Sequence, residues 1–433
     1  MGWRDLYQGR ITSAEEAVKS IQSGDRLFLT GNCSVPKFLL GALVERARAG
    51  DVENVQINQV LTIGSADYVA PEMAGKIRVN TLFISDNVRQ AVNDGRADYT
   101  PCFLSEIPKL FKEGIIPLDV ALIHCSPPDE HGFCSFGIEV GLTKPAAESA
   151  RMVIAEVNDR MPRTLGNSFI HVSKLTHVVP VSYDLTEVSM GKPGPIQQQI
   201  AAHIAELIPN GATLQMGIGG IPDAVLLYLR EKRDLGIHTE LLSDGVMTLI
   251  DEGVINNERK TIHRGKVVAG FILGSQRLYD YVHDNPIFEL HPQDYVNDPF
   301  VIAQNDNMIA INSAIEVDLT GQVCADSMGH RFYSGVGGQV DFVRGAARSK
   351  GGKPIIALPS TTKGDTISRI VSALQPGAGV VTSRHDVHYV VTEYGVAALY
   401  GKSIRQRVQA LIAIAHPNFR ADLTRFAQEQ GYI

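Results

Sequence analysis

Residues 24–31 read Gly-Asp-Arg-Leu-Phe-Leu-Thr-Gly, and an amphipathic stretch follows at 36–48. Residues 211–217 read Gly-Ala-Thr-Leu-Gln-Met-Gly, and an amphipathic stretch follows again, at 221–231. A short apolar run that leads into a helical pattern is typical of α/β folds, in which the parallel strands are buried on both faces. The chain therefore carries the same strand–helix unit twice.

The repeat extends through both halves of the chain. Further runs that predict buried strands occur at 120–124, 152–157, 267–273, 308–311 and 354–358. The run at 120–123 with its following turn resembles that at 309–311, and 176–181 resembles 387–392. We therefore expect an α/β protein with two related open α/β domains from an internal duplication. They would be an N-terminal domain at 1–190 and a C-terminal domain at 191–433, joined at the glycines and prolines of 191–195.

Composition excludes several classes of function. The 433 residues are 44% hydrophobic and 20% charged, as in ordinary globular proteins. A formal net charge of −7 argues against a nucleic-acid or anionic-membrane partner. No apolar run is long enough to span a membrane, and the N-terminus lacks the pattern of a signal peptide. We expect a cytoplasmic enzyme that acts on small molecules.

The cysteines do not predict a disulfide framework or a metal site. There are 5, irregularly spaced in a long chain. His124, Cys125, His131 and Cys134 are residue types that bind zinc. However, the second copy of the repeat has Asn, Ser and Thr at the positions of His124, Cys125 and His131, so the turn can be built without metal. We predict no metal ligands.

A glycine turn at 217–222 reads Gly-Ile-Gly-Gly-Ile-Pro between a predicted strand and a predicted helix. Its backbone N–H groups could bind an anion with help from the helix N-terminus. The turn also resembles a dinucleotide-binding turn, and Glu240 stands about twenty residues on, where a ribose-binding acid is expected. Because Pro222 replaces the third glycine of that pattern, a nicotinamide-dependent oxidoreductase is the more distant alternative.

Two other features are open to more than one interpretation. Glu240 lies at the end of a predicted strand, which is an ordinary place for a polar residue as well as for a nucleophile. A second glycine cluster at 334–342 reads Ser-Gly-Val-Gly-Gly-Gln-Val-Asp-Phe and leads into a basic run at 344–353. That run would suit phosphates, or it is a solvated loop.

Five motifs in one order carry a resemblance to a known family. They are Gly-Ile-Gly-Gly-Ile-Pro-Asp-Ala-Val at 217–225, Glu-Leu-Leu-Ser-Asp-Gly-Val at 240–246, the cluster at 334–342, Thr-Glu-Tyr-Gly-Val-Ala at 392–397 and His-Pro-Asn-Phe-Arg at 416–420. The chain resembles the acetyl-CoA hydrolase/transferase branch of the class I CoA-transferases. Within it, the resemblance is greatest to the 4-hydroxybutyrate CoA-transferases.

The resemblance implies an active site between two α/β domains, with Glu240 as the catalytic residue. It implies that one set of residues binds CoA or stabilises an oxyanion, namely Gly217, Ile218, Gly219, Gly220, Ile221, Ser334, Gly335, Gly337, Gly338 and Lys363. It places Asn297 and Glu393 at the substrate site.

The activity implied is CoA transfer from an acyl-CoA, such as acetyl-CoA or butyryl-CoA, to a short-chain carboxylate such as 4-hydroxybutyrate or acetate. Such transfer is ping-pong, through a glutamyl-CoA thioester. Coenzyme A is then a substrate, with no permanently bound cofactor, and a homodimer is expected. The nearest alternative is an acyl-CoA hydrolase, because water attacking the same intermediate gives hydrolysis. A CoA-binding regulator without turnover is a further alternative.

Overall fold

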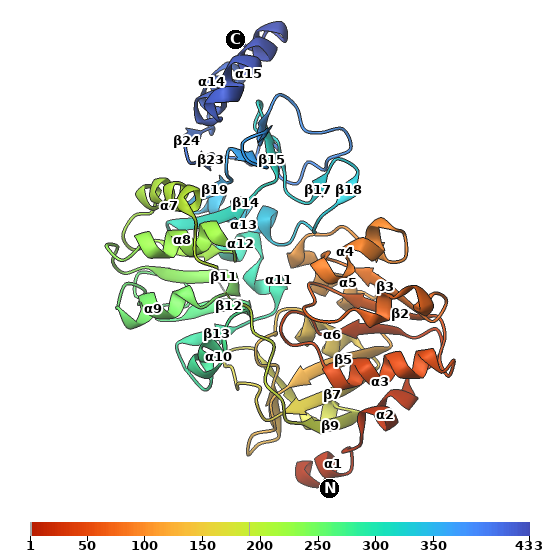
Figure 1. Ribbon diagram of the computed structural model, residues 1–433. Helices are drawn as coiled ribbons and strands as arrows, with labels where there is room; N and C mark the ends of the chain where they lie inside the picture. Colours follow the sequence, from red (N-terminus) through yellow and green to blue (C-terminus); the bar gives the residue numbers. More distant parts are fainter. Residues whose placement is uncertain (1, 190) are drawn as a thin grey trace. The chain divides into compact units, whose positions relative to one another are not determined.

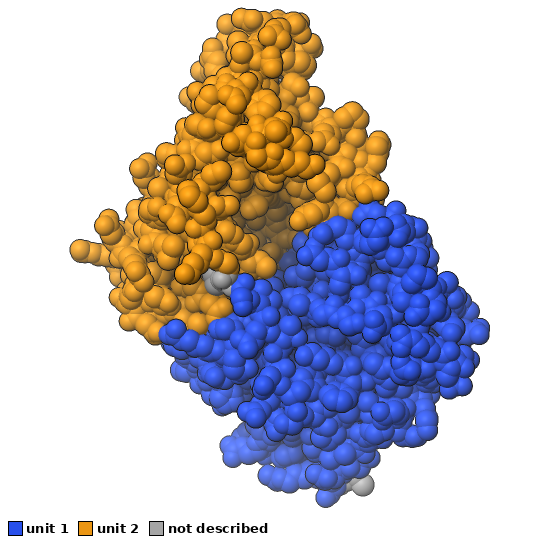
Figure 2. Space-filling view, in the orientation of Figure 1, with its two compact units in different colours: residues 1–189, 268–296 blue, residues 190–267, 297–433 orange. Residues whose placement is uncertain are grey.

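The structure, a computed structural model, describes residues 2–189 and 191–433 (Figure 1). The chain divides into two compact units (Figure 2). Unit 1 contains residues 1–189 and 268–296, and unit 2 contains 190–267 and 297–433. The segment 268–296 joins unit 1 through backbone bridges from Phe271 to Glu139 and from Leu290 to Gly166. The boundary predicted at residue 190 would assign this segment to the C-terminal domain, because that boundary follows the order of the sequence and not the contacts in the fold.

Unit 1 is built on a parallel sheet with strand order β4-β3-β2-β1-β5-β7-β9. Its strands are β1 (Arg26–Leu29), β2 (Val55–Gln59), β3 (Ile77–Thr81), β4 (Asp98–Tyr99), β5 (Val120–Cys125), β7 (Met152–Asn158) and β9 (His177–Val181). Every residue of β5 and of β7 is buried, which explains why these segments are continuous apolar runs rather than alternating ones.

Unit 2 repeats this order. Its strands are β10 (Thr213–Met216), β11 (Gly236–Leu242), β14 (Met308–Ser313), β19 (Lys353–Ala357), β23 (Tyr389–Thr392) and β24 (Gly395–Ala398). The order β11-β10-β14-β19-β23 is parallel and matches β2-β1-β5-β7-β9 strand for strand, and β24 adds an antiparallel edge. The prediction of two related α/β domains is therefore confirmed.

Helices follow the strands, as the apolar patterns predicted. In unit 1 they are α1 (Trp3–Gln8), α2 (Ala14–Ala17), α3 (Lys37–Arg48), α4 (Asp86–Asn93), α5 (Ile107–Lys112), α6 (Thr143–Ser149), α10 (Gln276–Val282) and α11 (Gln293–Val296). In unit 2 they are α7 (Pro195–Leu207), α8 (Gly220–Tyr228), α9 (Gly245–Asp251), α12 (Pro299–Ile302), α13 (Gln339–Arg348), α14 (Ile404–Ile414) and α15 (Pro417–Glu429). No helix in the described parts of the chain is both long and apolar enough to cross a membrane.

Short strands complete the two units. They are β6 (Phe133–Ser135), β8 (Phe169–His171), β15 (Glu316–Asp318), β16 (Val323–Cys324), β17 (Ser327–Met328), β18 (Arg331–Phe332), β20 (Thr361–Thr362), β21 (Ile367–Ser368) and β22 (Ile370–Val371). Two further strands, β12 (Val267–Ile272) and β13 (Phe288–Leu290), continue the sheet beyond β11 in the order β13-β12-β11.

Each unit has its own apolar core. In unit 1, Leu39 and Leu43 of α3 are fully buried against the side chains of β1 and β2. In unit 2, residues of β19 and β23 form a core with Leu411 of α14 and Leu423 of α15. These cores leave the loops at the carboxyl ends of the parallel strands free to carry polar side chains, as is usual for open α/β sheets.

Candidate active site

The glycine turn lies where β10 ends and α8 begins, as the sequence predicted. Gly219 caps the N-terminus of α8 with φ of +119°, a conformation that favours glycine. Gly219 and Gly220 are exposed, and Ile218 is 43% exposed. Because the first N–H groups of a helix have no partner within it, this turn presents backbone donors that could bind an anion or an oxyanion.

Glu240 lies near the carboxyl end of β11, the parallel neighbour of β10. The hydroxyl of Thr239 donates to the carbonyl of Met216 at 3.1 Å and is 3.4 Å from the Met216 nitrogen. Met216 is the last residue before Gly217. Glu240 and the glycine turn therefore lie at the same edge of the same sheet, held together by the strand pairing and by one side-chain hydroxyl.

The Glu240 carboxylate is held by an amide. Nδ2 of Asn297 donates to Oε2 of Glu240 at 2.9 Å. The pKa of Glu240 is raised to about 7, mainly by burial and also by the charge of Asp341, although hydrogen bonds from Asn297 and the Gly338 backbone act to lower it. The side chain keeps partial access to solvent even though protein surrounds its carboxylate. A carboxylate in this setting is poorly solvated and reachable, which suits a nucleophile.

Gly338 brings the backbone against this carboxylate. A Cβ atom at Gly338 would lie 1.9 Å from Oε2 of Glu240 and 2.2 Å from Nδ2 of Asn297. Its φ of −94° is open to any residue, so close approach, and not backbone conformation, requires glycine here. The structure thus brings together three of the predicted residues, Glu240, Asn297 and Gly338, from distant parts of the chain.

The rest of the second glycine cluster forms the turn before α13. Gly335 is buried, and Gly337 has φ of +59°. The Ser334 backbone N–H donates to the carbonyl of Asp326 at 3.1 Å. Lys363 is exposed in the turn between β20 and β21, with φ of +53°. These residues are accessible or form turns, but the described contacts do not join Ser334 or Lys363 to Glu240.

Glu393 is placed apart from Glu240. It follows β23 and accepts hydrogen bonds from the Ser360 backbone, at 2.9 Å, and from the Ser360 hydroxyl. Four strand spacings separate β23 from β11 in the sheet, or roughly 19 Å at the usual spacing. The substrate-site role predicted for Glu393 therefore does not come from contact with Glu240.

Two acidic residues near the site were not singled out from the sequence. Asp341, in the first turn of α13, is 3% exposed and lies 3.5 Å from Nδ2 of Asn297. Asp223, in the first turn of α8, has its pKa raised to about 6 by burial and by the charge of Asp244. The available signal in the sequence was an acidic residue in the first turn of a helix that follows a glycine turn. Such a residue usually indicates only a favourable interaction with the helix dipole.

Of the residues that raised the question of zinc, Cys125 and Cys134 lie within hydrogen-bond distance of each other, but the two histidines lie in different settings. His124 is fully buried, with Nδ1 3.2 Å from the carbonyl oxygen of Ser34. The side chain of His131 is 73% exposed, beside Glu130. The turn is built without bringing the two imidazoles to one point.

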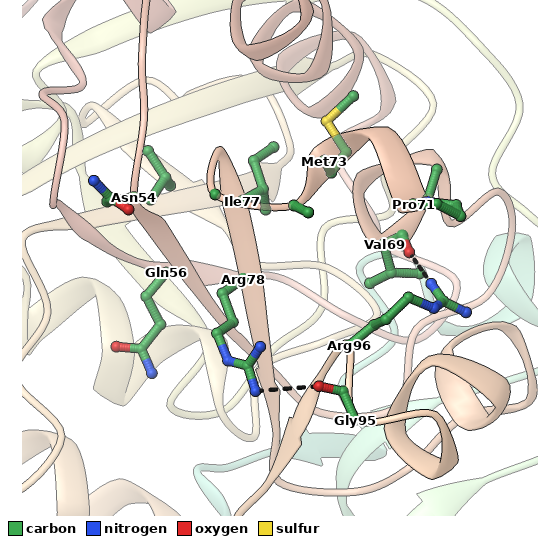
Figure 3. Close-up of a pocket in the computed structure, with 13 residues that line it drawn as sticks. Asn54, Gln56, Val69, Pro71, Met73, Ile77, Arg78, Gly95 and Arg96 are labelled. Atoms are coloured by element: carbon green, nitrogen blue, oxygen red, sulfur yellow. Dashed lines mark hydrogen bonds between the residues drawn. The ribbon is translucent and has the colours of Figure 1, made fainter.

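A cavity of about 550 Å³ lies in unit 1, away from all the predicted site residues (Figure 3). It opens where β2 and β3 begin, at the amino ends of these strands. Its two arginines are already engaged. Arg78 forms two hydrogen bonds with Asp98, and Arg96 donates to the carbonyl of Val69. The cavity therefore offers no unpaired charge for a substrate anion.

Comparisons with known proteins cover almost the whole chain. Residues 1–188 match the acetyl-CoA hydrolase/transferase N-terminal domain, and residues 274–427 match the C-terminal domain of the same description. The chain is 52% identical over 423 residues to the 4-hydroxybutyrate coenzyme A transferase of Clostridium kluyveri, covering 98% of each chain.

Two solved structures are similar throughout. The crystal structure of RipA from Yersinia pestis superposes with a TM-score of 0.94 at 39% identity and covers 100% of both chains. The crystal structure of a 4-hydroxybutyrate CoA-transferase from Porphyromonas gingivalis superposes with a TM-score of 0.86 at 43% identity. It covers 99% of this chain and 100% of that one.

Proposed function

The chain belongs to the acetyl-CoA hydrolase/transferase family, and on that premise we propose that it is a CoA-transferase that uses Glu240 as a covalent nucleophile. The donor is an acyl-CoA such as acetyl-CoA or butyryl-CoA, and the acceptor is a short-chain carboxylate such as 4-hydroxybutyrate or acetate. The observation that carries the proposal is the setting of the Glu240 carboxylate. It accepts a hydrogen bond from Asn297, is closely approached by the backbone of Gly338 and lies on the strand next to the exposed glycine turn.

The first half-reaction has two steps at Glu240. A carboxylate oxygen of Glu240 attacks the thioester carbon, the carbon–sulfur bond breaks, and CoA leaves as a thiolate from an acyl-glutamyl anhydride. The thiolate then attacks the Glu240 carbonyl carbon, the acyl group leaves as a free carboxylate, and a glutamyl-CoA thioester remains. The acceptor carboxylate reverses both steps. The acyl-transfer energy is retained, so no ATP is needed.

Each step passes through a tetrahedral oxyanion. When the attacked carbonyl belongs to Glu240 itself, the amide nitrogen of Asn297 is already within hydrogen-bond distance of its oxygen. When the attacked carbonyl belongs to the acyl group, the backbone donors of Gly219 and Gly220 could hold the oxyanion. One oriented donor contributes roughly 3–4 kcal/mol.

The pKa of Glu240 suits this role at neutral pH. A pKa of about 7 leaves a large fraction of the carboxylate ionised at pH 7 and makes it more basic than an ordinary glutamate. Because burial is the main cause of the shift, forming a neutral anhydride or thioester relieves the cost of a buried charge. The site thus favours acylation of Glu240.

Product analysis tests the reaction. The protein is incubated with acetyl-CoA and 4-hydroxybutyrate, butyrate or propionate, and the CoA products are identified. New acyl-CoA products support transfer. Free CoA at the same rate with and without acceptor would show the hydrolase instead. Hydride transfer in a parallel incubation with a nicotinamide cofactor would show the oxidoreductase alternative.

Glu240→Gln tests the nucleophile, because the amide has nearly the same volume and is a far weaker nucleophile. We expect transfer to fall about a thousandfold or more. Borohydride added after acyl-CoA should reduce the thioester to an alcohol on the peptide that contains Glu240, and acceptor acid should prevent this. Full activity of Glu240→Gln, or labelling of Glu393 instead, would refute the assignment. The homodimer and the cytoplasmic location stay predictions.

A further inference from the structure

The amide of Asn297 lies between two carboxylates. Its Nδ2 is 2.9 Å from Oε2 of Glu240 and 3.5 Å from Oδ2 of Asp341. An amide nitrogen carries two hydrogens, so it can face both oxygens at once. Asp341 is 3% exposed and comes from α13, whereas Asn297 precedes α12 and Glu240 is in β11.

The second carboxylate contributes to the orientation of the Asn297 amide. If the Asn297 amide were reversed, Oδ1 would point at the oxygens of both Glu240 and Asp341, and three acceptors would repel one another. Oδ1 itself is buried and has no hydrogen-bond partner among the described residues, so it does not hold the amide in place. The orientation that gives Glu240 a donor therefore depends on the acceptors that face the nitrogen, and Asp341 is one of them.

Asp341 also acts on the charge of Glu240. Of the groups that shift the Glu240 pKa, Asp341 is the charged one and raises it, whereas Asn297 and the Gly338 backbone are neutral donors that lower it. This repulsion exists only while Glu240 is a carboxylate. It disappears when Glu240 becomes a neutral anhydride or thioester.

We propose that Asp341 is a positioning residue for the transfer reaction, which holds the nitrogen of Asn297 on Glu240 and destabilises the Glu240 carboxylate relative to its acylated forms. The proposal rests on the proposed function, since it requires Glu240 to be the nucleophile. Asp341 acts through Asn297 and through its charge, without taking part in bond formation.

The pH dependence of kcat/KM separates this role from a purely structural one. The acid limb of the free enzyme reports the ionisation of Glu240. Asp341→Asn removes the neighbouring charge, so the limb should move down by about one pH unit. Asn297→Ala removes a donor that favours the carboxylate, so the limb should move up. A structural defect lowers activity by one factor at every pH and moves neither limb.

Trapping gives a second readout. With acyl-CoA and no acceptor, Asp341→Asn should leave a smaller fraction of Glu240 as borohydride-reducible thioester at equilibrium than the wild-type protein does. Asp341→Ser replaces the asparagine variant if that variant does not fold. Asp341→Glu keeps the charge, so the acid limb of its kcat/KM profile should lie closer to that of the wild-type protein. Asp306→Asn is the matched control. It removes one negative charge from unit 2 just before β14, at the opposite edge of the sheet, where Asp306 faces Lys350.

The outcomes distinguish this proposal from the one on which it rests. If Glu240→Gln abolishes transfer but Asp341→Asn leaves the acid limb and the trapped fraction unchanged, Asp341 is not a positioning residue. If Glu240→Gln retains transfer, the proposed nucleophile is wrong. A limb that moves equally in Asp306→Asn would also overturn the inference, because net charge would then be the cause.

Discussion

Replacing Gly338 by alanine tests whether close approach of the backbone to Glu240 is required for transfer. The added Cβ would lie 1.9 Å from Oε2 of Glu240, whereas ordinary contacts begin at 3.4 Å. The carboxylate or the loop must therefore move by about 1.5 Å. A displacement of roughly 1 Å from the reacting geometry costs about 100-fold in rate. We expect kcat/KM to fall by at least about 100-fold, or about 2.7 kcal/mol of transition-state stabilisation.

The assay compares transfer kinetics with folding in the same variant. Alanine adopts the backbone conformation of Gly338, so the thermal transition should remain cooperative. Gly191→Ala is the matched control in unit 2, because a Cβ there meets nothing within 4 Å. Borohydride labelling of Glu240 should fall together with kcat/KM. A Gly338→Ala variant with transfer within about threefold of wild type would refute the reasoning, since the expected displacement costs far more than that.

Two further predictions concern stability. Because the pKa of Glu240 is raised from 4.5 to about 7, the folded state holds this proton more tightly than the unfolded chain, and stability falls as pH rises through this window. Glu240→Gln should therefore be more stable than wild type at pH 8, by at most about 3 kcal/mol, and should lose this advantage near pH 4.5. Thermal midpoints of both proteins at the two pH values check this, and a difference that does not change with pH would contradict it. Gly41→Ala, at an exposed interior position of α3 where a Cβ meets nothing within 4 Å, should stabilise unit 1 by about 0.5–1 kcal/mol. Denaturant unfolding measures the change, and a loss of stability would show that the glycine has another role.

Local patterns predicted the elements that carry the fold. The runs at 120–124, 152–157, 213–216 and 308–311 are strands β5, β7, β10 and β14. They could be predicted because a buried parallel strand must be apolar along its whole length, so it can be recognised from consecutive residues alone. The internal repeat extended the prediction to two similar domains, and the structure shows the same strand order in both units.

Other features depended on contacts that no local pattern encodes. The segment 268–296 lies beyond the predicted boundary yet belongs to unit 1, because its backbone bridges to 139 and 166. Glu393 and Glu240 both follow from family motifs, but the strand order separates them by four positions in the sheet. Spacing along the chain does not measure such distances.

By itself, the sequence determined the α/β class, the duplication and the glycine turn at the start of α8, and the resemblance to a family then singled out Glu240 as the candidate nucleophile. These follow from periodicity, from glycine and proline chemistry, and from ordered motifs, all of which are properties of neighbouring residues. Only the tertiary structure decided that Asn297, Gly338 and Asp341 surround the Glu240 carboxylate. That arrangement arises because parallel strands bring their carboxyl ends to one edge, where loops distant in sequence meet and where burial and neighbouring charge then raise the pKa of Glu240.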